Sequence, residues 1–158
     1  MKGIADKKIS FVFQEDRLLP WVSAKKNILA VNPDEALCME LLDRVGLQGQ
    51  ENKLPSELSG GMSRRIAIAR ALAYDGDIFL LDEPFKGFDV KLKRSMMDFI
   101  QTRTKNKLCV FVTHEIEEAQ KMADKVLILG GPPLEIKKEL DLKKYGSDYL
   151  QKIVNEML

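Results

Sequence analysis

Four apolar residues at positions 78–81 are followed at once by two carboxylates, Asp82 and Glu83, and then by Pro84. A continuous apolar run of this length is typical of a strand that is buried on both faces of a parallel sheet. In an open α/β sheet, ligands bind outside the carboxyl ends of the strands. The pattern therefore predicts a strand that delivers two carboxylates to a binding edge. Taken alone, an acidic pair that ends a strand in a surface turn explains these residues equally well.

Strand and helix patterns alternate on both sides of this segment. Strands are expected at residues 9–13, 78–81, 108–113 and 125–129, and helices after Asn32 and at residues 62–74, 91–104 and 115–123. This alternation predicts the α/β class, with a parallel sheet covered by helices on both faces and a helical subdomain at residues 21–74. The glycines and prolines at 130–133 end that unit, and we expect a charged, helical tail over residues 135–158.

The composition favours a soluble globular domain, with 45% hydrophobic and 31% charged residues. The net charge of +1 gives no bulk attraction to nucleic acid, so no nucleic-acid partner is expected. The apolar runs are too short to cross a bilayer, which means that any membrane function requires a partner. Cys38 and Cys109 have no metal-type spacing and are expected to be the reduced thiols of a cytosolic protein.

Ser59, Gly60 and Gly61 precede a predicted helix that carries arginines at 64, 65 and 70. Two glycines leave backbone amides unobstructed, and a helix N-terminus attracts anions, so the segment is a candidate phosphate site. A serine cap with a Gly-Gly turn is the structural alternative, with the arginines on a solvated face.

Two further polar residues, Gln14 and His114, each follow an apolar strand, where they can reach the same ligand as Asp82. A purely structural role is the alternative for His114, the only histidine. Leu18, Leu19 and Trp21 form an apolar cluster in an expected loop, which is typical of a partner contact.

The order of these features resembles that of the ATP-binding subunits of ABC transporters. Residues 12–14 look like their Q-loop, 58–62 like the signature, 78–84 like the Walker B motif, 86–89 like the D-loop, and His114 like the switch histidine. Five motifs in this order are far more specific than any single match. Residues 14–21 and the methionine in the signature resemble importers of nitrate, taurine or aliphatic sulfonates. Ser63 and Arg64, in contrast, depart from the Arg-Gln pair that is common after this signature.

The resemblance implies two subunits that close head to tail around ATP and Mg²⁺. It implies catalytic roles for Glu83, which orients the attacking water, and for His114 and Gln14. It further assigns Asp82 and Gln14 to magnesium, Ser59, Gly60 and Gly61 to a partner's ATP, and Asp89 to the dimer interface. The loop 14–21 would contact the transmembrane permease, which a substrate-binding protein supplies. The expected location is cytoplasmic, peripheral on the inner face of the cell membrane.

The phosphate loop of the family, GxxxxGK[ST], does not occur in this sequence, because none of the ten glycines is followed by lysine. We therefore expect a truncated phosphate-loop NTPase-type fold, a partial domain over residues 1–158 with parts at 21–74, 75–134 and 135–158. Without the strand that carries this loop, apolar sheet faces should be exposed. The chain alone should be inactive, and a non-catalytic module that docks on a permease or a complete ATPase is the alternative. A chromosome-maintenance ATPase would need a coiled coil between the motifs, and a translation factor would need a second motif set.

Overall fold

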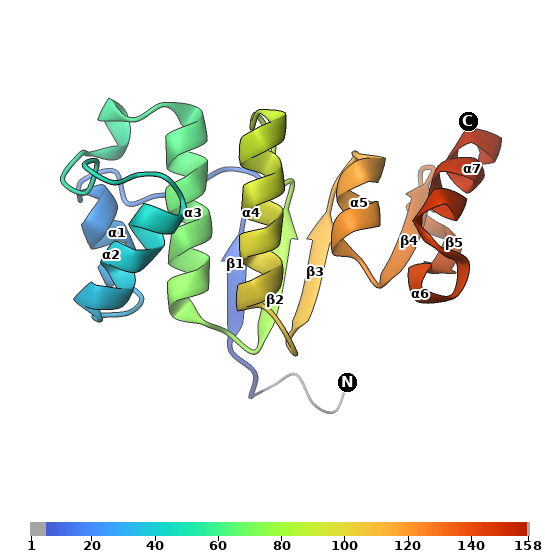
Figure 1. Ribbon diagram of the computed structural model, residues 1–158, viewed down its shortest axis with the longest axis horizontal. Helices are drawn as coiled ribbons and strands as arrows, with labels where there is room; N and C mark the ends of the chain where they lie inside the picture. Colours follow the sequence, from blue (N-terminus) through green and yellow to red (C-terminus); the bar gives the residue numbers. More distant parts are fainter. Residues whose placement is uncertain (1–5, 158) are drawn as a thin grey trace. The chain divides into compact units, whose positions relative to one another are not determined.

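The computed structural model describes residues 6–157, so residues 1–5 and 158 of the expected domain lie outside the description. The chain divides into two compact units, one ending at Val112 and the other beginning at Thr113. Figure 1 shows the elements of both units along the chain.

The first unit is built on a three-stranded parallel sheet, which confirms the predicted α/β class. Its strands are β1 (Ile9–Val12), β2 (Ile78–Asp82) and β3 (Leu108–Val112), in the order β1-β2-β3. Val12 lies opposite Leu81, and Asp82 lies opposite Val112. Because the strands are parallel and in this register, their carboxyl ends share one edge of the sheet.

The first unit contains helices at the three places where the sequence patterns predicted them, and one further α-helix at residues 24–29 that those patterns did not predict. The unit contains α1 (Ala24–Leu29), α2 (Glu35–Arg44), the short 3₁₀ helix η1 (Pro55–Glu57), α3 (Gly60–Tyr74) and α4 (Val90–Arg103). α1 and α2 pack against α3, forming the helical subdomain, and α3 also packs against β1. α2 begins two residues later than its expected start, because the side chain of Asp34, not of Asn32, accepts the Leu37 N–H at 3.0 Å and caps the helix.

The two faces of the parallel sheet differ in their cover. α3 and α4 lie over one face (Figure 1), where Val12, Phe79 and Leu81 are buried. Along each strand the alternate residues point to the other face, and there Phe11, Leu108, Val110 and Val112 are exposed. The expected exposure of apolar sheet surface is thus confirmed. The sequence also predicted helices over both faces of the sheet, and within residues 6–112 no helix covers this second face.

The second unit corrects two sequence-based predictions. It contains α5 (Ile116–Met122), β4 (Lys125–Gly130), β5 (Glu135–Asp141), α6 (Leu142–Tyr145) and α7 (Ser147–Met157). β4 does not extend the parallel sheet but pairs antiparallel with β5, and the start of the predicted helical tail is a strand. No sequence pattern indicated β5, because the strand is highly charged and Leu140 is its one buried residue. Leu140 lies in a core with Leu142, Leu150 and Ile153.

Among the described residues, none of the helices has the length and apolar character that crossing a membrane requires.

Candidate functional site

The turn after β2 presents the two predicted carboxylates. Asp82 is the last residue of β2 and is half-buried. The Glu83 backbone has a left-handed φ of 43°, which is uncommon for a residue other than glycine, and its N–H donates to the Val112 carbonyl at 3.0 Å. The Glu83 carboxylate lies 3.0 Å from the Lys86 ammonium. Strained backbone of this kind is concentrated at functional sites, which is consistent with the predicted role of Glu83.

Gln14 follows β1 at the same edge of the sheet, and its side chain is exposed. Its carbonyl accepts a 2.8 Å hydrogen bond from Arg64 Nη2. The backbone of the Q-loop start is therefore held in place while the amide side chain faces solvent.

Ser59 caps α3, because its hydroxyl accepts the Met62 N–H at 3.3 Å. A β-carbon on Gly60 or Gly61 would meet no atom within 4 Å outside the local backbone, and neither glycine has a left-handed φ. Neither packing within the chain nor backbone conformation therefore requires glycine at these two positions. Glycines that the fold does not need leave room for a ligand or a partner to approach the backbone.

Asp89 is exposed and caps α4 by accepting the Leu92 N–H at 2.9 Å. Its helix-capping role is thus visible within the chain, and the interface role stays a prediction. His114 is exposed and belongs to the second unit, two residues beyond Val112. Its proximity to Asp82 and Glu83 also stays a prediction.

The loop that contains Trp21 is organised around one buried amide. Asn27 is fully buried; its Oδ1 accepts the Leu19 N–H at 2.8 Å, and its Nδ2 donates to the carbonyls of Leu19, Val22 and Ser23, each at 3.2 Å. Trp21 is nevertheless 73% exposed. The exposure expected of this apolar cluster is confirmed, on a loop whose backbone is fixed before any partner binds.

The arginines of α3 have a role that sequence reasoning missed. Arg64 is buried and donates to the carbonyls of Phe13, Gln14 and Glu83. Arg65 donates to the carbonyls of Val45, Gly46 and Gly61, and Arg70 donates to Asn27 Oδ1 and to the Asp16 carbonyl. These guanidinium groups are used inside the chain, which corrects the interpretation of the arginines as a solvated helix face. In the sequence, the unusual Ser63-Arg64 pair was the one sign that these arginines have such a role. The phosphate site at Ser59, Gly60 and Gly61 stays a prediction.

Asp16 supplies the negative charge beside these arginines. Its Oδ1 lies 3.2 Å from Arg64 Nη1. Burial raises the pKa of Asp16 above its ordinary value, and the charges of Arg64 and Arg70 oppose that shift.

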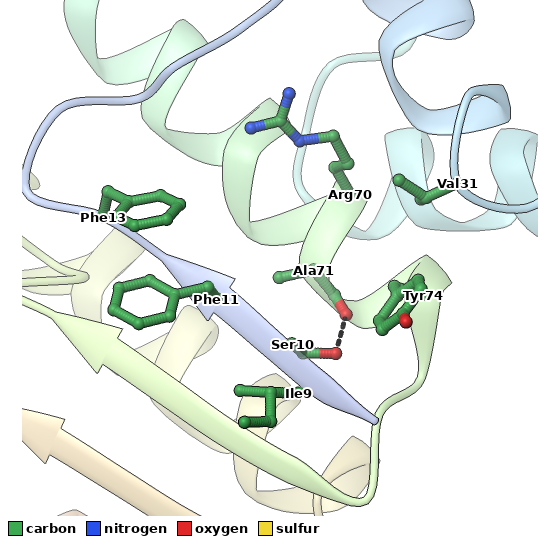
Figure 2. Close-up of a pocket in the computed structure, with 8 residues that line it drawn as sticks. All are labelled: Ile9, Ser10, Phe11, Phe13, Val31, Arg70, Ala71 and Tyr74. Atoms are coloured by element: carbon green, nitrogen blue, oxygen red, sulfur yellow. Dashed lines mark hydrogen bonds between the residues drawn. The ribbon is translucent and has the colours of Figure 1, made fainter. Parts of the chain in front are cut away.

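A pocket of about 250 Å³ lies between β1 and the C-terminal half of α3 (Figure 2). The rings of Phe11 and Phe13 stack at 4.0 Å on one side of it, and Tyr74 lies on the other. None of the predicted site residues lines the pocket.

Comparisons with known proteins agree with the family resemblance of the sequence. The ABC transporter family model matches residues 2–86, more than half of the chain. The aliphatic sulfonates import ATP-binding protein SsuB 2 of Pseudomonas syringae pv. tomato is 39% identical over 138 residues, which cover 84% of this chain and 60% of that protein. The SsuB protein of Bacillus licheniformis is 41% identical over 135 residues, covering 81% and 53%.

A solved structure also matches. The dimeric ATP-binding cassette MJ0796, in a post-hydrolysis state bound to ADP and Pi, superimposes with a TM-score of 0.76 at 31% identity over 85% of this chain and 63% of that one. The chain spans little more than half the length of the two sulfonate-import relatives. The family match, together with a fold and motif order that agree with it, shows that the chain belongs to the ABC transporter family.

Proposed function

We propose that this chain carries the signature, Walker B and switch segments of an ATP-binding subunit that energises import of a small solute of the sulfonate, taurine or nitrate type. The observation that carries the proposal is the pair of glycines at the start of α3, which the chain's own packing does not require. The sulfonate-import names of the relatives support the solute class.

The proposed site is composite. Ser59, Gly60 and Gly61 contact the γ-phosphate of ATP held by a second ATPase subunit, in a head-to-tail dimer with Asp89 at the interface. A dimeric relative among solved structures supports this arrangement. Because the sequence contains no GxxxxGK[ST], the loop that grips the β- and γ-phosphates lies outside these residues.

In a subunit that includes a phosphate loop, Glu83 orients the attacking water of that subunit's own site, and His114 and Gln14 complete that site around the γ-phosphate. At the composite site closed by Ser59, Gly60 and Gly61, the corresponding residues of the partner take these roles. Phosphoryl transfer to water is then accelerated by positioning and charge stabilisation. Within the chain, the Glu83 carboxylate pairs with the Lys86 ammonium at 3.0 Å.

Magnesium fits the chemistry of the strand ends. Mg²⁺ bound with nucleotide uses one or two protein oxygens and takes its remaining ligands from phosphates and water. Asp82, half-buried at the end of β2, and Gln14 at the end of β1 would hold it. In the described part of the chain, no group of three or more His, Cys, Asp or Glu side chains could hold a metal ion. When bound, the ion neutralises developing charge on the phosphate oxygens.

The exposed Trp21 on its fixed loop is the proposed contact for the transmembrane permease subunits, to which a substrate-binding protein delivers the solute. This assignment places the chain in the cytoplasm, peripheral on the inner face of the membrane. The alternative function is a non-catalytic module with the same contacts, and the absence of GxxxxGK[ST] from the sequence favours it for the chain alone.

Nucleotide titration and ATP hydrolysis test the proposal, first with the purified chain and then with a complete ABC ATP-binding subunit added. We expect weak binding and near-background turnover alone, and stimulation of the mixture that Ser59→Arg abolishes. Glu83→Gln should matter little in the mixture, because the water-orienting glutamate of that site belongs to the partner. Robust turnover by the chain alone that disappears in Glu83→Gln would contradict the composite site, and an unstimulated mixture would favour the non-catalytic module.

A further inference from the structure

The Arg64 guanidinium lies at the junction of three segments that the sequence keeps far apart. The side chain is only 4% exposed, although it carries a permanent charge. The guanidinium donates no hydrogen bond to its own helix. Its acceptors are the carbonyls of Phe13 and Gln14, which follow β1, and the carbonyl of Glu83, which follows β2. Its counterion is Asp16, also in the loop after β1.

The geometry of these contacts requires an arginine. Nη1 serves the Phe13 carbonyl and the Asp16 carboxylate, while Nη2 donates to Gln14 O at 2.8 Å and to Glu83 O at 3.3 Å. A planar fork with several N–H groups can satisfy acceptors on both of its terminal nitrogens at once. Lysine has a single charged nitrogen, and glutamine has one amide nitrogen on a shorter side chain, so neither spans the same acceptors.

The acceptors are not arbitrary positions. Gln14 and Glu83 are two of the predicted site residues, and Glu83 has the left-handed backbone described above. We infer that Arg64 is a positioning residue that fixes the backbones of Gln14 and Glu83 to α3, so that the two catalytic segments and the signature helix move as one body. The tether itself stands on contacts within the chain, and only its consequence for ATP hydrolysis depends on the proposed function.

Arg65 provides a matched control one position along the same helix. It is also largely withdrawn from solvent and donates to three carbonyls, but these belong to Gly61 in its own helix and to Val45 and Gly46 after α2. The same substitution at 64 and 65 therefore removes a comparable number of hydrogen bonds from two different places.

The test is hydrogen exchange of the full chain by mass spectrometry, comparing Arg64→Gln, Arg64→Lys and Arg65→Gln with the unaltered protein. In Arg64→Gln we expect amide exchange to accelerate about tenfold in the peptides covering 12–17 and 83–88, the factor for loss of a typical tethering hydrogen bond. Arg65→Gln should leave both peptides unchanged and accelerate the segment 45–49. Arg64→Lys should retain part of the protection at 12–17, through Asp16, and lose it at 83–88.

The inference is overturned if only one of the two peptides responds to Arg64→Gln, or if Arg65→Gln produces the same pattern. Should Arg64→Gln unfold the chain, Arg64→Lys decides, because exchange that rises evenly over the whole chain would show that Arg64 merely stabilises the fold. No nucleotide is present in these measurements, so their outcome is independent of the ATP titration that tests the proposed function.

Discussion

Gly76 lies so close to Ser10 that a β-carbon at position 76 would come within 2.7 Å of the Ser10 amide nitrogen. The same β-carbon would lie 2.9 Å from the Lys8 carbonyl oxygen. The buried Ser10 hydroxyl accepts the Gly76 N–H at 2.9 Å and donates to the Ala71 carbonyl at 2.8 Å (Figure 2 shows the latter bond). This contact joins the start of β1 to the end of α3 and to the turn before β2.

Gly76→Ala should therefore lower the free energy of unfolding by roughly 1–3 kcal/mol, because rigid backbone atoms have to shift to admit the methyl group. Urea unfolding followed by circular dichroism measures the change. Gly61→Ala is the matched control, since a β-carbon there meets no atom within 4 Å. Equal effects of the two substitutions would contradict the close-approach argument.

Ser10→Ala tests the hydrogen bonds of the same contact. The substitution leaves the Gly76 N–H without its acceptor inside the protein, which typically costs about 1–3 kcal/mol. Ser56→Ala, at an exposed position in η1, should leave the urea midpoint unchanged. A midpoint in Ser10→Ala that matches the control would mean that water replaces the lost hydroxyl.

The sequence predicted the three strands and the helices α2, α3 and α4 of the first unit because these elements have clear periodicity, but it did not predict α1. The apolar run before Asp82 and the Ser59 cap of α3 are local signals that the structure follows, whereas α2 is capped by Asp34 and not by Asn32 as expected. The pairing of β4 with β5 was not predicted, because the charged composition of β5 gives no strand signal and its only buried residue is Leu140.

The hydrogen bonds that hold the site residues in place could not be predicted from the sequence. The positions of Gln14, Ser59 and Asp82 followed from motif order, but hydrogen bonds to backbone carbonyls leave no trace in residue patterns. Arg64 and Asn27 owe their importance to such bonds. A buried polar side chain is recognisable only once the fold places its acceptors around it.

Substitutions at Trp21 and Asn27 should distinguish a side chain that is free to contact a partner from one that the fold requires. Trp21→Ala should change stability by no more than about 0.5 kcal/mol, because the side chain is 73% exposed. Asn27→Ala should lower it by roughly 2 kcal/mol or more, because several backbone groups of the loop lose their partner. Urea unfolding measures both, and a large loss of stability in Trp21→Ala would remove the case for a free docking side chain.

The open face of the parallel sheet should respond to polar substitution without loss of stability. Val110 and Val112 are 47% and 52% exposed, and threonine keeps their branched shape in a strand. The double variant Val110→Thr, Val112→Thr should bind less of a dye specific for apolar surface and stay soluble at higher concentration. Leu81→Ala, on the covered face, should instead lose roughly 2–5 kcal/mol of stability. Unchanged dye binding in the double variant would show that these valines are covered in solution.

Cys109 provides a prediction about pH. Burial raises the pKa of its thiol from 9.0 to about 11, so the folded chain holds the thiol proton more tightly than the unfolded chain does. The resulting contribution to stability is complete below the unfolded pKa of 9.0 and is lost as the pH rises through about 11. At pH 8 the thiolate fraction in the folded chain is about a hundredfold smaller than in the unfolded one, the ratio that two pKa units impose.

Alkylation by iodoacetamide checks this difference, because only the thiolate reacts. In a Cys38→Ala background, where Cys109 is the single thiol, the folded chain at pH 8 should react about a hundredfold more slowly than the same chain in urea. The folded rate should then climb steeply between pH 9 and about 11. Equal rates in the folded and unfolded chains at pH 8 would show that the Cys109 thiol is not protected by burial in β3.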